Sequence, residues 1–271
     1  MTLRKFSQRK PVFCYFLLTF FLSWGAAFAL VAGKIFYHHP LSQMDGLLMF
    51  PLMILGPFVS SLVLNASNGG RQAIRKVFAG MNPRRIPGAW LTVLLIPPLT
   101  IFLVLLALSK IVSPEYSPGH FWMGFTFGIL AGILEEIGWM GFAYPNMVRR
   151  LKALPAGILL GILWSLWHLP VINFLGSASP HGQYWMTYFL SFAAVMTAMR
   201  VIIAWIYQNT KSLLLCQLMH ICSTGFLVAF SPSPIAAAKE PIWYFVYAAV
   251  LWILVAFLAS RYGTNLDQKS V

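Results

Sequence analysis

Two adjacent glutamates, Glu135 and Glu136, lie inside a stretch, Phe121–Phe142, that is otherwise apolar enough to cross a membrane. A charged side chain near the bilayer centre costs roughly 2.5–3.5 kcal/mol on insertion scales, so such a residue usually has a function. Two neighbouring carboxyls repel each other if both ionise, and we expect one of them to keep its proton. A carboxyl that can take and release a proton can perform acid–base chemistry.

Two histidines occupy other apolar stretches. His168 lies in Ala156–Leu175, one helical turn after Trp164, so that the indole and the imidazole share a helix face. His220 lies in Ser212–Phe230. Two carboxyls and two imidazoles from three helices can converge in the core of a bundle, and such convergence indicates a functional site.

A polar stripe surrounds the second histidine. Gln217, His220 and Thr224 follow the spacing i, i+3, i+7 and therefore lie along one face of a helix. The alternative interpretation of such a stripe, and of either histidine taken alone, is hydrogen bonding between neighbouring helices.

The composition predicts the fold that must position these residues. The chain is 59% hydrophobic and 9% charged, whereas a soluble domain has about a quarter charged residues. Apolar stretches near the length of about 20 residues that crosses a bilayer are Val12–Ala32, Leu47–Leu64, Trp90–Val112, Phe121–Phe142, Ala156–Leu175, Tyr184–Ile206, Ser212–Phe230 and Ile242–Ser260. We therefore predict an all-α polytopic membrane protein with about eight transmembrane helices and a polar site in the bundle core. Residues 1–271 are predicted to form a single membrane domain.

The basic excess is distributed asymmetrically along these spans. The net charge is +13, and with a cytoplasmic N-terminus only Lys34, Lys110 and Lys239 fall on the far side of the membrane, while Arg200 falls within a span. The other basic residues lie on the cytoplasmic side, which predicts a multi-pass protein with both termini in the cytoplasm. The charge is explained by insertion and by contact with anionic lipids of the bilayer, so nucleic acid is not expected as a partner.

The polar residues form three motifs that resemble the CPBP family, which includes the type II CAAX prenyl endopeptidases and the bacteriocin-processing and abortive-infection proteins of bacteria. The family pattern is Glu-Glu-x-x-x-Arg-Gly, then Phe-x-x-x-His, then His-x-x-x-Asn. The corresponding segments here are EEIGWMG (Glu135 to Gly141), WSLWH (Trp164 to His168) and HICST (His220 to Thr224). The resemblance covers roughly residues 90–230, and the short loops and small size favour a bacterial cell membrane.

The resemblance implies an intramembrane endopeptidase that cuts a membrane-associated protein or peptide. Glu135 would be the general base that activates water, with assistance from His168. His220 would orient the substrate carbonyl or stabilise the oxyanion, and Glu136 would be an orienting partner. Trp164 and Thr224 would belong to the substrate-orienting and oxyanion region.

The metal requirement stays open at this point. We expect no cofactor, because a catalytic zinc takes three protein ligands and would occupy Glu135, which could then no longer act as a free base. The alternative is a zinc ion held by Glu135, His168 and His220.

Two departures from the family pattern matter, while a third, Trp164 in place of phenylalanine, is milder because both residues are aromatic. Met140 replaces the arginine that would neutralise Glu136 from one turn away, and Thr224 replaces asparagine. Glu136 must then stay protonated, interact with a histidine or obtain a cation from elsewhere, and Arg200 is the candidate. The departures also support an alternative function, in which a weakened or inactive family member acts as a membrane immunity or regulatory binding protein. A haem-binding or ion-handling protein is a third hypothesis.

Overall fold

The computed structural model describes residues 3–175 and 181–267, and this part of the chain is helical without strands. The α-helices are α1 (Leu3–Arg9), α2 (Pro11–Phe36), α3 (Gln43–Ala79), α4 (Ile96–Ile111), α5 (Phe125–Gly138), α6 (Tyr144–Met147), α7 (Ala153–Trp167), α8 (Leu169–Leu175), α9 (Trp185–Thr210), α10 (Leu213–Phe230) and α11 (Glu240–Tyr262). A π-helical turn, Trp139–Ala143, joins α5 to α6. Short 3-10 helices occupy Pro83–Arg85, Gly88–Leu95, Pro114–Tyr116, Trp122–Gly124, Gly182–Tyr184 and Gly263–Asn265.

The predicted fold class is confirmed. Within the described residues, seven helical segments are long and apolar enough to cross a membrane: Pro11–Phe36, Met44–Ala79, Gly88–Ile111, Trp122–Met147, Gly182–Thr210, Leu213–Phe230 and Glu240–Asn265. The chain is therefore an integral membrane protein.

The predicted span Ala156–Leu175 is not one continuous helix. The chain instead forms α7 and α8, which are separated at His168. Pro170 lacks an N–H and disfavours helical backbone in the residue before it, which explains why the helix is interrupted here. At about 1.5 Å per residue, the 15 residues of α7 cover about 22 Å, less than the hydrocarbon core of about 30 Å.

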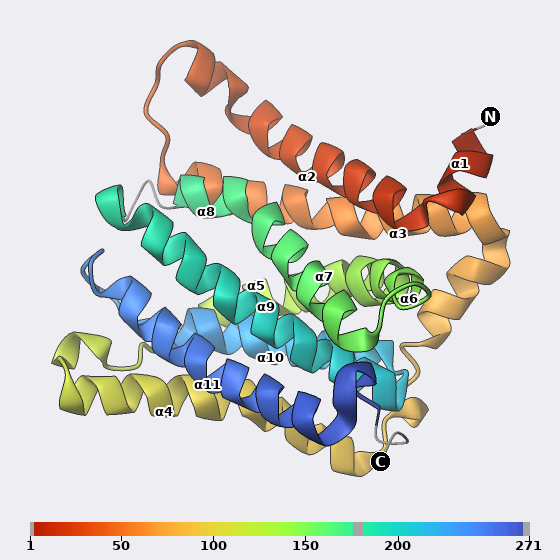
Figure 1. Ribbon diagram of the computed structural model, residues 1–271. Coiled ribbons are helices and arrows are strands. Elements are labelled where there is room, and N and C mark those ends of the chain that lie inside the picture. The colour runs from red at the N-terminus through yellow and green to blue at the C-terminus, as the bar shows by residue number, and fades with distance from the viewer. Residues whose placement is uncertain (1–2, 176–180, 268–271) are drawn as a thin grey trace.

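Helices α5, α7, α9 and α10, which carry or adjoin the predicted site residues, lie in the middle of the bundle (Figure 1). The most extensive helix contacts are those of α5 with α10 and of α7 with α9, while α3 covers α5 from the side of α2. In Figure 1 the N- and C-terminal ends of the described chain lie on the same side of the bundle. Segments that are far apart in the sequence thus surround the middle of α5.

Glycine lets the backbones of α5 and α10 approach closely. A Cβ atom placed on Gly128 would lie 2.5 Å from the backbone nitrogen of Gly225, and one on Gly132 would lie 2.7 Å from the carbonyl oxygen of Gln217. No side chain fits at these distances, so small residues are required where the two helices touch. This contact places α10 beside the two glutamates of α5.

Candidate active site

Glu135 is buried on α5 and is held on one side only. The indole N–H groups of Trp139 and Trp164 both donate to its Oε2 atom, at 3.0 and 2.9 Å. Its Oε1 atom is buried and has no hydrogen-bond partner among the described residues. The carboxyl group is therefore fixed in orientation with one oxygen free to accept a hydrogen bond.

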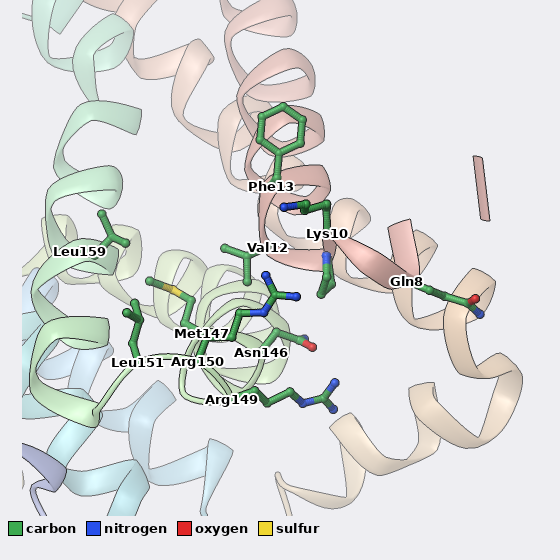
Figure 2. Close-up of a pocket in the computed structure, with 11 residues that line it drawn as sticks. Gln8, Lys10, Val12, Phe13, Asn146, Met147, Arg149, Arg150, Leu151 and Leu159 are labelled. Atoms are coloured by element: carbon green, nitrogen blue, oxygen red, sulfur yellow. The ribbon is translucent and has the colours of Figure 1, made fainter. Parts of the chain in front are cut away.

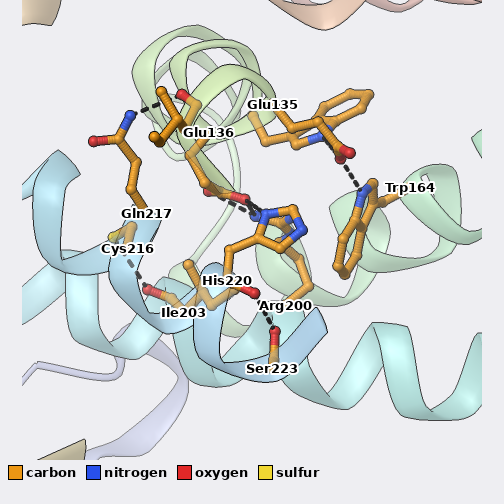
Figure 3. Close-up of polar contacts among 11 residues, drawn as sticks. Glu135, Glu136, Trp164, Arg200, Ile203, Cys216, Gln217, His220 and Ser223 are labelled. Atoms are coloured by element: carbon orange, nitrogen blue, oxygen red, sulfur yellow. Dashed lines mark hydrogen bonds and ion pairs between the residues drawn. The ribbon is translucent and has the colours of Figure 1, made fainter. Parts of the chain in front are cut away.

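Glu136 forms a buried ion pair that joins three helices (Figure 3). Nη1 of Arg200, on α9, donates to both carboxylate oxygens at 2.7 and 2.9 Å. Nδ1 of His220, on α10, lies 2.7 Å from Oε1. The side chains of Glu136 and Arg200 are fully buried. A carboxylate with two such partners is satisfied as an anion, so Glu136 can hold the other groups in place.

Arg200 supplies the cation that Met140 cannot supply. The pairing hypothesised from the sequence, with Arg200 or a histidine next to Glu136, is found with both partners at once. Met140 is itself buried. The guanidinium carbon of Arg200 also lies 4.1 Å from the centre of the Trp164 ring, in a cation–π arrangement.

The break after α7 determines how His168 is oriented. The backbone N–H of His168 donates to Ser165 rather than to Trp164, so the carbonyl of Trp164 lacks the usual helical donor. Nδ1 of His168 lies 2.8 Å from that carbonyl oxygen. A carbonyl only accepts, so Nδ1 carries the proton and the neutral ring keeps a lone pair on Nε2. By the same reasoning, Glu136 fixes a proton on Nδ1 of His220.

Trp164 connects the predicted site residues. Its ring centre lies 5.3 Å from that of His168 and 5.0 Å from that of His220, both in edge-to-face geometry. The same ring lies under Arg200, and its N–H binds Glu135. The sequence placed the Trp164 ring beside His168 but did not indicate that its indole N–H binds Glu135. Trp139 was also missed, although its position one turn after Glu135 could have indicated the contact.

The helix that carries the glutamates widens into a π-helical turn, and neighbouring helices donate hydrogen bonds to its backbone carbonyls. The π-helical turn Trp139–Ala143 begins directly after α5, and such turns are frequent at functional sites. Ser61 of α3 donates to the carbonyl of Ile137 at 2.9 Å, and Gln217 of α10 donates to that of Ile133 at 2.8 Å. Gln217 therefore hydrogen-bonds a neighbouring helix, as the alternative interpretation of the polar stripe expected.

Several buried polar atoms near the glutamates lack a partner in the described part of the chain. They are Oε1 of Glu135, Oε1 of Gln217, and Nε and Nη2 of Arg200. Buried polar groups in native proteins are nearly always hydrogen-bonded to protein or to ordered water. We therefore predict ordered water molecules in this site.

The predicted site residues differ in how closely the structure joins them. Glu135, Glu136, Trp164 and His220 are linked directly, and His168 joins them through the ring and the carbonyl of Trp164. Thr224 is half-buried on α10, and the structure gives its hydroxyl no hydrogen bond to a described residue. Its role in orienting substrate stays a prediction.

The side chains of the zinc alternative are Glu135, His168 and His220. Within residues 3–175 and 181–267, no group of three or more His, Cys, Asp or Glu side chains is arranged to hold a metal ion. Oε2 of Glu135 already accepts two indole N–H groups, which leaves only Oε1 for a ligand. Nδ1–H of each histidine donates to an acceptor and leaves a lone pair on Nε2, an arrangement that metal-binding histidines also have. The expectation of no cofactor therefore stays a prediction, and the mechanism below has no step through a metal.

The indole hydrogen bond of Trp164 can be tested with a matched pair of variants. Trp164→Phe removes a donor to a carboxylate, a bond worth about 1.5–3 kcal/mol, so we expect kcat to fall by roughly 10- to 100-fold. Trp167→Phe is the control, because Trp167 is equally buried on α7 and its N–H has no acceptor among the described residues. Equal losses in peptide cleavage by the two variants would show that bulk, not the donor, matters at Trp164.

The fold and the site define a polytopic membrane protein with a buried acid–imidazole cluster. The family model of the type II CAAX prenyl endopeptidases, Rce1-like, matches residues 117–226. The CAAX prenyl protease 2 of Methanococcus maripaludis is 28% identical over 246 residues, which cover 83% of this chain and 85% of that protein. Both matches support the CPBP family, so the resemblance indicated by the three motifs is confirmed.

Proposed function

We propose that this protein is an intramembrane endopeptidase in which Glu135 activates a water molecule. The observation that carries the proposal is the asymmetric carboxyl of Glu135, with Oε2 fixed by two indoles and Oε1 buried and free of described partners. Glu136, Glu115, Asp45 and Glu240 each have a basic partner, whereas none is found for Glu135 among the described residues. Glu135 is thus suited to accept a proton.

The proposed reaction hydrolyses a peptide bond in balanced steps. Glu135 takes a proton from water as the water oxygen bonds to the scissile carbonyl carbon, and Nε2 of His168 assists by accepting a hydrogen bond from the same water. The carbonyl oxygen becomes an oxyanion, which His220 stabilises when Nε2 is also protonated. Glu136 favours that imidazolium through Nδ1, as a carboxylate does for a catalytic histidine in serine proteases. Glu135 then returns its proton to the leaving nitrogen as the C–N bond breaks.

We propose a membrane-associated substrate of the kind named for the relative, a prenylated CAAX protein or peptide. This proposal is supported by the match to the type II CAAX prenyl endopeptidases over residues 117–226. That segment contains the four proposed catalytic residues, Glu135, Glu136, His168 and His220. The positive-inside distribution supports a cytoplasmic location for both termini.

A binding role without cleavage is the second candidate. The hydroxyl of Thr224, where the family has asparagine, makes no hydrogen bond to a described residue, and loss of a preorganised oxyanion donor typically costs about two to three orders of magnitude in rate. Such a protein would hold its partner in the membrane as an immunity or regulatory factor.

One assay distinguishes these candidates. The purified protein in liposomes is incubated with a farnesylated CAAX peptide and with the same peptide lacking the prenyl group, and the products are identified by mass spectrometry. We expect release of the C-terminal tripeptide from the prenylated peptide. Retention of intact peptide without any cleavage would support the binding role, and cleavage that ignores the prenyl group would contradict the substrate class.

A further inference from the structure

A cavity separate from the acid–imidazole site opens between the start of α2 and the segment that joins α6 to α7 (Figure 2). Its volume is about 460 Å³. Its lining combines basic side chains, Lys10, Arg149 and Arg150, with apolar ones that include Phe13 and Leu159. None of these residues belongs to the site around Glu135, so the mechanism leaves the cavity without a role.

The polar part of the cavity wall is positively charged. Lys10, Arg149 and Arg150 line it, and all three are exposed. Arg150 donates one hydrogen bond, from Nη2 to the carbonyl of Arg9 at 3.3 Å, and no acidic group of a described residue pairs with it. The lining contains no acidic residue. Three cations around one cavity therefore favour an anion with several acceptor oxygens, as a phosphate has.

The rest of the wall is apolar, and part of it is exposed. Phe13 is 57% exposed, Leu159 is 42% exposed and Leu151 is 39% exposed. Val12 and Met147 line the same space from α2 and α6. A free phosphate or another small hydrophilic anion would leave this surface without a partner. A ligand that carries both a phosphate and a hydrocarbon chain would satisfy both parts of the wall.

The position of the cavity agrees with such a ligand. Lys10 directly precedes Pro11, the first residue of a membrane-spanning helix, so the cations lie at the end of a span where lipid headgroups lie. Basic pockets between transmembrane helices at a membrane surface bind anionic headgroups. Leu159 lies farther along α7, in the direction of the hydrocarbon.

We propose that this cavity is a binding site for one anionic phospholipid molecule. Its phosphate lies among Lys10, Arg149 and Arg150, and an acyl chain follows Phe13 and Leu159. The bound lipid links the start of α2 to the segment after α6, and so holds the first span against the helices that carry the active site.

The test uses native mass spectrometry of the purified full chain with phosphatidylglycerol, phosphatidylcholine or inorganic phosphate. The cavity variant is Lys10→Gln/Arg149→Gln/Arg150→Gln. The matched control is Arg71→Gln/Arg75→Gln/Lys76→Gln, which removes the same types and number of exposed charges from α3, outside the cavity. We expect the parent and the control to bind one phosphatidylglycerol, and the cavity variant to bind it about 100-fold more weakly, from the electrostatic contribution of three cations.

Three outcomes would overturn the proposal. Equal weakening in the cavity variant and the control would show that only the overall charge matters. Equal binding of phosphatidylcholine would show that the cations do not select the headgroup. Occupancy by inorganic phosphate at the same concentration as the lipid would assign the site to a free anion instead. A thermal unfolding curve that matches the parent shows that the cavity variant is folded when binding is measured.

Discussion

Glu135→Gln should reduce kcat for peptide cleavage by about 10²- to 10⁴-fold, the range that a general base contributes. The amide oxygen of glutamine can still accept the two indole hydrogen bonds that fix Glu135 through Oε2. The amide cannot take a proton from water, so the fold and substrate binding should persist while the chemical step fails. The measurement is single-turnover cleavage in liposomes, together with KM and thermal unfolding.

Glu115→Gln is the control for this variant. Glu115 is an exposed carboxylate paired with Lys239 at 2.6 Å, and the Lys239 hydrogen bond lowers the pKa of Glu115. Its replacement removes a carboxylate from the connection between two membrane-spanning segments, outside the active site, so kcat should stay near that of the parent. Cleavage by Glu135→Gln at the parent rate would show that another group is the base.

Arg200→Met should cause the second large effect, on stability and on activity together. Arg200 is fully buried against Glu136, and removing one partner of a buried ion pair typically costs about 3–5 kcal/mol because the other charge is left uncompensated. Glu136 would then depend on His220 alone, and Trp164 would lose the cation over its ring. Thermal unfolding in detergent should shift to clearly lower temperature, and cleavage should be nearly lost.

A second-site change separates the loss of charge from the loss of packing. Met140→Arg in the Arg200→Met background returns a cation to the position where the family has one, and we expect part of the stability and activity to return. In the parent background, Met140→Arg adds a second buried cation beside the same carboxylate and should be harmful. The effect of Met140→Arg on stability and activity would thus change sign with the residue at position 200, which is an energetic coupling between the two positions. Independent, additive effects would contradict the idea that Arg200 replaces the family arginine.

The fold class could be predicted because hydropathy alone separates membrane spans from connections. The break in Ala156–Leu175 was not predicted, although Leu169 and Pro170 are visible in the sequence, because a proline can also occur in a continuous transmembrane helix. The π-helical turn after Glu136 has no sequence pattern that predicts it. Just before this turn, the carbonyl of Ile137 in α5 accepts a hydrogen bond from Ser61 of α3, a contact that depends on tertiary packing.

The site residues could be proposed from their cost in lipid and from their spacing, but their partners could not. Glu136 and Arg200 are 64 residues apart in sequence, and only the packing of α10 against both α5 and α9 decides that they meet. Trp164 was expected in the substrate-orienting region and Trp139 was not identified, because the sequence does not show where the one polar atom of an indole points. The indole N–H groups of these two residues hold Oε2 of Glu135 in place. The sequence could therefore identify the carboxyl group but not which of its oxygens is free.

We expect Glu135 to present a free oxygen to water inside the helix bundle. High-resolution cryo-electron microscopy of the protein in a lipid nanodisc would test it directly. We predict density for a water molecule within about 3.2 Å of Glu135 Oε1, and within hydrogen-bonding reach of an imidazole Nε2 atom. A Glu135 carboxyl facing acyl chains, or a dry site with both imidazoles beyond the reach of a bridging water, would contradict the account.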